Sequence, residues 1–171
     1  MKFKITLIIA LALLCSATGA QAGGGQKLSK QEKKALVAQQ VKQAIDSRTL
    51  SIDVTRRLGG GFDSGSNAQG YSVAVRNDSV ISDLPHYAVS TEPAMGGDYQ
   101  ESLHFSQKLD GWEIQPKKKN KNIVLFQATD HGREYIYQAE IYDNGKTVLN
   151  VFCNRASTVS FQGQLRLPKV E

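Results

Sequence analysis

The stretch REYIYQAEIYDNGKTVLNVFC, residues 133–153, decides the fold class of this chain. In its first half every second residue is apolar or aromatic, which is the period of a β-strand with one buried face. The pair Asn144-Gly145 follows, and it favours a tight hairpin because both residues tolerate the positive φ of a type I′ turn. Alternation then resumes in KTVLNVFC. The inward residues are expected to be Tyr135, Tyr137, Ala139 and Ile141 before the turn, and Thr147, Leu149, Val151 and Cys153 after it.

The same two-residue period recurs along most of the chain after Arg48. It is found in LSIDV (50–54), YSVAV (71–75) and TVSFQGQLRL (158–167), among other segments. About eight or nine short strands with hairpin-length connections predict a mainly β fold. We expect a single antiparallel meander that forms a small, lipocalin-like barrel or a sandwich, and the pattern leaves these two architectures open.

One helix is predicted ahead of the strands, over residues 29–47. Ser29 and Glu32 have the spacing of a capping box, in which each side chain accepts a hydrogen bond from the other residue's backbone N–H. A narrow apolar stripe follows at helical spacing, and Lys and Gln fill the rest of the surface. The helix is therefore expected to pack on the outside of the β-domain (49–168). The stripe consists of Val37, Val41, Ala44 and Ile45, with Leu36 beside it.

The first residues have the pattern of a secretory signal peptide. The basic start MKFK precedes an apolar run of ten residues, Ile5–Leu14, which is too short to cross a bilayer as a helix. Ala20 and Ala22 have the spacing of a cleavage site. We expect a signal peptide over 1–22, a flexible leader over 23–28 and one domain over 29–168, in a periplasmic or secreted protein. Lipidation of Cys15 is not expected, because large leucines precede it.

Charge and cysteine content exclude some classes of function. Cleavage after Ala22 would leave 149 of the 171 residues, and the net charge would fall from +5 to +3 with the loss of Lys2 and Lys4. Such a mild charge argues against nucleic-acid binding, which requires a strongly basic face. Cys153 would be the single remaining cysteine, so an internal disulfide is impossible and the core alone must stabilise the fold.

Two segments together resemble a known family. They are YSVAVRNDSVISDLPHYAVSTEPAMGGDYQESLHF (71–105) and IYDNGKTVLNVFCNRASTVSFQGQL (141–165). The matching features are the Ser-Asp-Leu-Pro exit from a strand, the Gly-Gly pair before an x-L-x-F strand, the lysine-rich run and the NGK turn. The chain is similar in these features to domain-of-unknown-function family 4251, exported proteins of Bacteroides-type bacteria. The resemblance covers residues 30–167 and implies a Gram-negative envelope setting, but no activity and no catalytic residue.

The loop SDLPHYAVSTEPAMGGDY (82–99) is the first candidate for function. Binding residues often gather on loops at the end of a rigid sheet. The candidate ligand-binding residues are Asp83, His86 and Tyr87, together with the inward Tyr135 and Tyr137. The alternative for the loop is a purely structural role, and for the tyrosines a packed core with satisfied hydroxyls.

A hydrolase site is the alternative chemistry for this loop. Asp83 and His86 would act with a serine such as Ser90 or Ser102, although no G-x-S-x-G element supports this. His86, His104 and His131 lie in separate segments, so we expect neither a metal site nor a cofactor.

A lysine-rich run is the second candidate. Lys117, Lys118, Lys119 and Lys121 would form an anionic-surface patch that contacts lipid headgroups, with about 1 kcal/mol from each lysine. The alternative is a solvated hairpin whose lysines discourage association between sheet edges. Together these patterns favour an exported, non-enzymatic envelope protein that binds a small ligand, lipid or protein partner through its β-domain. A hydrolase or a purely structural envelope protein is the alternative.

Overall fold

The computed structural model describes residues 29–58, 68–85, 103–153 and 156–169, without the side chains of residues 116–118 and 156–157. The signal peptide, its cleavage site, Cys15 and the leader lie outside these residues. The described residues form one helix and nine strands. These are α1 (Lys30–Asp46), β1 (Leu50–Leu58), β2 (Ser72–Arg76), β3 (Ser79–Leu84), β4 (Leu103–Lys108), β5 (Gly111–Lys118), β6 (Lys121–Asp130), β7 (Arg133–Tyr142), β8 (Lys146–Cys153) and β9 (Ala156–Leu165).

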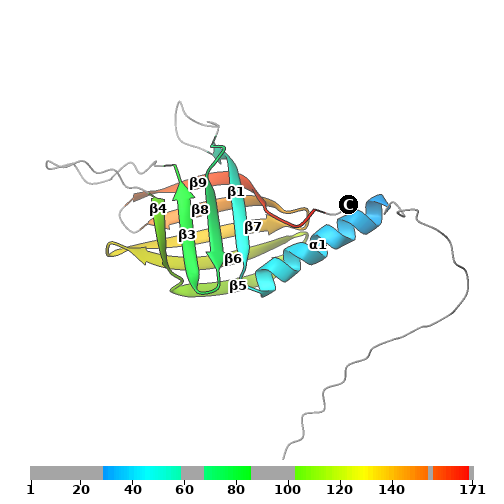
Figure 1. The fold of residues 1–171 in the computed structure, drawn as a ribbon, viewed down its shortest axis with the longest axis horizontal. Coiled ribbons are helices and arrows are strands. Elements are labelled where there is room, and N and C mark those ends of the chain that lie inside the picture. Colours follow the sequence, from blue (N-terminus) through cyan, green and yellow to red (C-terminus); the bar gives the residue numbers. More distant parts are fainter. Residues whose placement is uncertain (1–28, 59–67, 86–102, 154–155, 170–171) are drawn as a thin grey trace, which may run out of the picture.

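All nine strands belong to one antiparallel sheet in the order β4-β3-β2-β1-β9-β8-β7-β6-β5. Two meanders, β1–β4 and β5–β9, are joined where the first strand pairs with the last. The sheet curls into a half-barrel, so that β1–β4 cross over the strands of the second meander (Figure 1). This confirms the predicted mainly β fold with one helix before it. Strands β4 and β5 are the two edges of the half-barrel.

Large side chains fill the concave face of the sheet. The predicted two-residue period holds, because Tyr135, Tyr137, Ala139 and Ile141 are all at most 3% exposed. Phe126 on β6 stacks on Tyr137 with ring centroids 4.9 Å apart and an interplanar angle of 1°. A buried aromatic side chain contributes about 1.5–3 kcal/mol through the hydrophobic effect. The interior of the half-barrel is therefore a packed core at these positions.

The hairpin turns correct one detail of the prediction. Between β7 and β8 only Gly145 has a positive φ, 79°, and its N–H donates to the Tyr142 carbonyl over 2.8 Å. Three residues form this loop, so it is a type I turn ending in a left-handed glycine and not the expected type I′ turn. Two residues with positive φ, His131 and Gly132, instead connect β6 to β7. The Asn-Gly pair therefore predicted the position of the hairpin correctly, but the predicted turn type was wrong.

The capping box predicted at the start of α1 is confirmed. The Glu32 N–H donates to Ser29 Oγ over 3.2 Å, and the Ser29 N–H donates to Glu32 Oε2 over 2.7 Å. The backbone and side-chain hydrogen bonds with Ser29 lower the pKa of the Glu32 carboxyl. Only the carboxyl-terminal half of the helix reaches the core, through Val41 and Ile45, while Leu36 is 38% exposed. The helix lies beside one end of the half-barrel and extends away from it (Figure 1).

Across the described part of the chain, no helix combines the length and the apolar character required to cross a bilayer.

Candidate functional site

The two inward tyrosines predicted as ligand-binding residues lie in the core. Tyr137 is fully buried, and its hydroxyl donates to Ser82 Oγ on β3 over 3.0 Å. Burial raises the pKa of the Tyr137 hydroxyl and keeps it protonated. Tyr135 is 3% exposed and packs on Phe105 of β4 with ring centroids 5.1 Å apart. Both tyrosines therefore join the two crossing layers of the half-barrel.

Asp83 pairs with a histidine that the sequence did not connect to it. His104 lies opposite Asp83 in the β3–β4 register, and its Nδ1 is 3.0 Å from Asp83 Oδ1. Both side chains are exposed, at 64% for His104 and 40% for Asp83. His86, Tyr87, Ser90 and Ser102 lie outside the described residues, so the loop site and the hydrolase hypothesis stay predictions.

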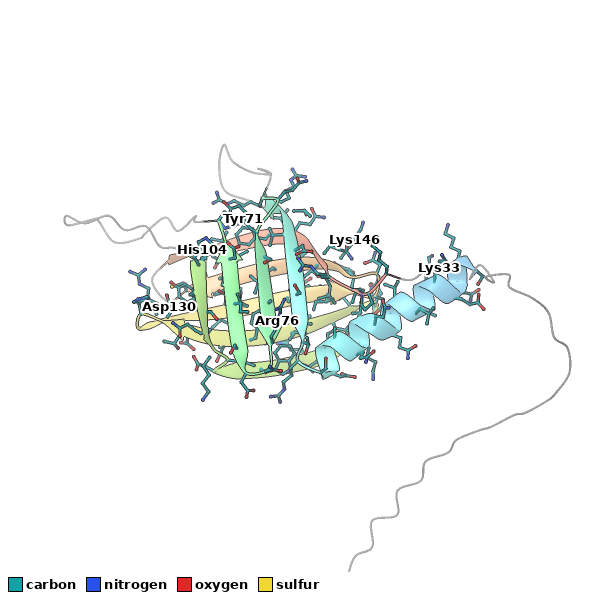
Figure 2. The ribbon with its side chains drawn as sticks, viewed as in Figure 1. Lys33, Tyr71, Arg76, His104, Asp130 and Lys146 are labelled. Atoms are coloured by element: carbon teal, nitrogen blue, oxygen red, sulfur yellow. The ribbon has the colours of Figure 1, made fainter. Side chains whose placement is uncertain are left out.

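Asp130 forms a polar contact between the edge strand β4 and β6. Its carboxylate accepts a hydrogen bond from Gln107 Nε2 over 2.7 Å and lies 2.9 Å from His131 Nδ1. Burial by itself would raise the pKa of Asp130, but the hydrogen bonds from His131 and Gln107 and the charge of His131 outweigh it and lower the pKa. In Figure 2, Asp130 and His104 lie at the end of the molecule opposite to Lys33 and Lys146. We call this the aspartate end, and the other the helix end.

The helix end contains a groove with a volume of about 750 Å³. One wall is the amino-terminal half of α1, and the other is formed by the β5–β6 and β7–β8 turns. This volume lies within the range of about 300–1,000 Å³ that is typical of small-molecule sites. The described residues that line the groove are Lys30, Lys33, Lys34 and Val37 of the helix, and Asn120, Asp143 and Asn144 of the turns.

The lysines of this groove lie on the stripe of α1 that faces the β-domain. Positions 30, 33, 34 and 37 continue, at helical spacing, the stripe that reaches the core through Val41 and Ile45. The sequence pattern predicted that Lys and Gln fill the surface of the helix outside the apolar stripe, and these three lysines are exposed. The domain-facing stripe is therefore apolar in its second half and cationic in its first, and the cationic half borders a groove.

The charges in the groove are unbalanced. Lys30, Lys33 and Lys34 are exposed, and none forms an ion pair with another described residue. Asp143 is the acidic residue among the described lining. The described walls thus carry three formal positive charges against one negative charge.

Backbone and side-chain hydrogen bonds order the wall opposite the helix. The Asp143 N–H donates to the Asn120 carbonyl over 3.0 Å and joins the two turns. Asn144 Oδ1 accepts from the Lys146 N–H over 3.0 Å, and the Asn144 carbonyl accepts from Gln164 Nε2 over 3.1 Å. The wall is therefore fixed by contacts within the β-domain and does not depend on the helix.

A second groove of about 490 Å³ adjoins the first. The two share Lys33, Val37 and Asn144, so they meet beside the middle of the helix. The second groove adds the apolar side chains of Leu167 and Pro168, which follow β9. Its cation, Arg166, is paired with Asp53, and this hydrogen bond raises the pKa of Arg166.

The predicted lysine patch is only partly described. Lys119 is exposed in the β5–β6 turn at the helix end. Lys121 is half-buried and bonded to Glu140, and this hydrogen bond raises the pKa of Lys121. Its charge is therefore already matched within the protein. The side chains of Lys117 and Lys118 lie outside the described residues, so the anionic-surface patch stays a prediction.

Among the described side chains, no three His, Cys, Asp or Glu residues gather closely enough to hold a metal ion.

A family model for a domain of unknown function, DUF4251, matches residues 32–165. The match covers most of the chain, including all of α1 except its first two residues and all nine strands. This chain belongs to the DUF4251 family. The resemblance found in the sequence is therefore confirmed. None of the curated proteins matches the chain.

A solved structure has the same fold as this DUF4251 chain. It is the crystal structure of a DUF4251 family protein from Bacteroides eggerthii, with a TM-score of 0.60 and 11% sequence identity. The match covers 81% of this chain and 92% of the other. At this identity the likeness supports the half-barrel fold and nothing about the residues of the groove.

Proposed function

We propose that this DUF4251 chain is an exported, non-enzymatic envelope protein that binds an anionic ligand at its helix end. The observation that carries the proposal is the groove of about 750 Å³ bordered by three exposed lysines without an ion pair to any described residue. Ammonium groups at such a site attract a negatively charged ligand and raise its local concentration. The export pattern at residues 1–22 supports the envelope setting.

The packed interior also favours binding at the helix end over binding inside the half-barrel. Phe126, Tyr137 and Phe161 are fully buried and occupy the middle of the concave face. A ligand there would have to displace side chains that are already in close contact. The groove has space without such a displacement.

Native mass spectrometry tests both parts of the proposal. Protein released from the envelope without detergent should begin at Gly23 and carry a bound anionic small molecule. The triple variant Lys30→Gln, Lys33→Gln, Lys34→Gln should lose the bound mass. Lys42→Gln is the matched control, because Lys42 lies on the same helix but pairs with Asp46 and does not line the groove.

Three results would count against the proposal. A full-length or acylated chain would contradict cleavage after Ala22. An equal bound mass in the triple variant would place the ligand outside the groove. Absence of any bound mass, together with no uptake of added inorganic phosphate, would remove the ligand-binding function.

A further inference from the structure

We infer that the ligand is a single-chain amphiphile with an anionic head group, such as a carboxylate or phosphate. This inference rests on the proposed function and names the class of ligand. It is drawn from the two adjoining grooves, which differ in chemistry but meet at the same residues. The lysines of one groove form no ion pair with another described residue, and the other groove has apolar side chains.

The first groove fits the head group. Lys30 and Lys34 are one helical turn apart, and Lys33 lies between them on the same stripe. Three ammonium groups on one wall can donate several charge-assisted hydrogen bonds to one carboxylate or phosphate.

The second groove fits the alkyl chain. From the lysines it leads past Val37 to Leu167 and Pro168. The aliphatic stems of Lys33 and Lys34 extend the apolar surface at the entrance, because lysine side chains cover apolar groups while their amines stay in water. Arg166 does not compete for the head group, since Asp53 already holds its guanidinium. The amides of Gln40 and Gln164 also line this groove, and the Gln40 Oε1 atom is buried.

The partial contact of the helix with the core explains why this space exists. Val41 is fully buried, but four residues earlier Val37 is only half-buried. A helix with apolar residues at positions 30, 33 and 34 would have closed onto the β7–β8 turn. Lysines cannot be buried there without a partner, because removing an ammonium group from water is costly. The lysine-bearing half of the helix therefore stays apart from the β7–β8 turn, and the space between them can hold an apolar ligand with an anionic head.

Isothermal titration calorimetry with monoalkyl phosphates tests the ligand class. Butyl, octyl and dodecyl phosphate are titrated below their micelle concentrations, with inorganic phosphate and octyl glucoside as the head-only and neutral probes. From butyl to octyl the affinity should rise roughly tenfold or more, since each buried methylene contributes to binding. The lysine-to-glutamine triple variant should weaken octyl phosphate binding roughly tenfold, and Lys42→Gln should not.

Variants of the apolar wall separate the chain from the head group. Leu167→Ser should reduce the gain in affinity with chain length but leave phosphate binding unchanged, because Leu167 lines the second groove and is not among the described residues of the first. Leu36→Ser is its matched control, because Leu36 is 38% exposed and is not among the described residues lining either groove.

The possible outcomes distinguish the inference from the proposed function. Equal affinity for inorganic phosphate and all alkyl phosphates would overturn the amphiphile and leave an anion site. Octyl glucoside binding as tightly as octyl phosphate would overturn the anionic head group. Binding to anionic vesicles but to no monomeric probe would overturn the groove in favour of a membrane contact. No binding of any anion would remove the proposed function as well.

Discussion

The two ends of the half-barrel differ in whether their polar side chains have partners among the described residues. At the aspartate end, Asp130 is bonded to Gln107 and His131, and deeper in the core Tyr137 is bonded to Ser82. At the helix end, three lysines face a groove without an ion pair to another described residue. Buried polar groups need partners because an unpaired one costs about 1–3 kcal/mol. The aspartate end therefore contributes to stability, while the charges of the helix end are those that we propose bind a ligand.

Removal of a core ring should have the largest effect. Tyr137→Ala should lower the free energy of unfolding by about 3–5 kcal/mol, because it leaves a cavity beside Phe126. Urea denaturation followed by circular dichroism measures the change. A loss below about 1 kcal/mol would mean that the two layers do not meet at this ring. Lys146→Gln, an exposed position at the other end, is the control.

Removal of the Tyr137 hydroxyl should reduce the free energy of unfolding by a smaller amount, and a second substitution at its partner Ser82 should restore most of it. Tyr137→Phe should cost about 1–3 kcal/mol, because it leaves Ser82 Oγ buried without its donor. Adding Ser82→Ala should recover most of this loss, since both polar groups are then absent. A double-mutant cycle from urea unfolding measures the coupling. Strictly additive losses would show that the hydrogen bond does not join the layers.

The charge of Asp130 should contribute about 1 kcal/mol at neutral pH. Its pKa is lowered in the folded protein, so the unfolded chain binds the proton first as the pH falls. The contribution is therefore present above the ordinary aspartate pKa of about 3.9 and is lost as the pH falls through the lower folded value.

Asp130→Asn measures this contribution. The variant should be less stable than the wild-type protein at neutral pH, and the difference should shrink at about pH 3. Asp46→Asn is the control, because Asp46 is exposed and, among the described residues, pairs with Lys42 along the helix. If the difference in stability between the two proteins were the same at both pH values, the effect would come from the change in side-chain hydrogen bonding and not from the charge of Asp130.

The groove lysines should have the smallest effect on folding. The triple variant of Lys30, Lys33 and Lys34 to glutamine should change the free energy of unfolding by no more than about 0.5 kcal/mol, because exposed charges contribute little. The melting temperature, measured by calorimetry, should shift by a degree or two at most. A loss of several degrees would mean that the lysines hold the helix on the domain, and the contrast between the two ends would disappear.

Much of the fold could be predicted because its signals are local. The two-residue period of β7 placed Tyr135 and Tyr137 on the inner face, and the structure buries both. Ser29 and Glu32 predicted the start of the helix from a spacing of three residues. The turn type at Gly145 could not be predicted in the same way. It depends on the length of the loop, which is set by the register of the flanking strands and not by the Asn-Gly pair alone.

The candidate site could not be predicted, because its residues come from distant segments. The lysines of α1 meet Asn120 and Asn144 only after the sheet has curled and both hairpins have formed. One signal was present in the sequence: Lys30, Lys33 and Lys34 continue the helical stripe of Val37 and Val41. By hydrophobicity alone, however, the stripe ends at Val37. A helix face can change from apolar to cationic along its length, and only packing reveals which part is covered.

The sequence by itself determined the strands, the helix start and the inward residues of most strands, because each depends on neighbours within a few positions. The tertiary structure decided which sheet edges stay open, which distant hydroxyl bonds to Tyr137, and that three exposed lysines border a groove. These contacts join segments separated by tens of residues, such as Ser82 and Tyr137. Their geometry follows from the curl of the whole sheet, which no short stretch of sequence contains.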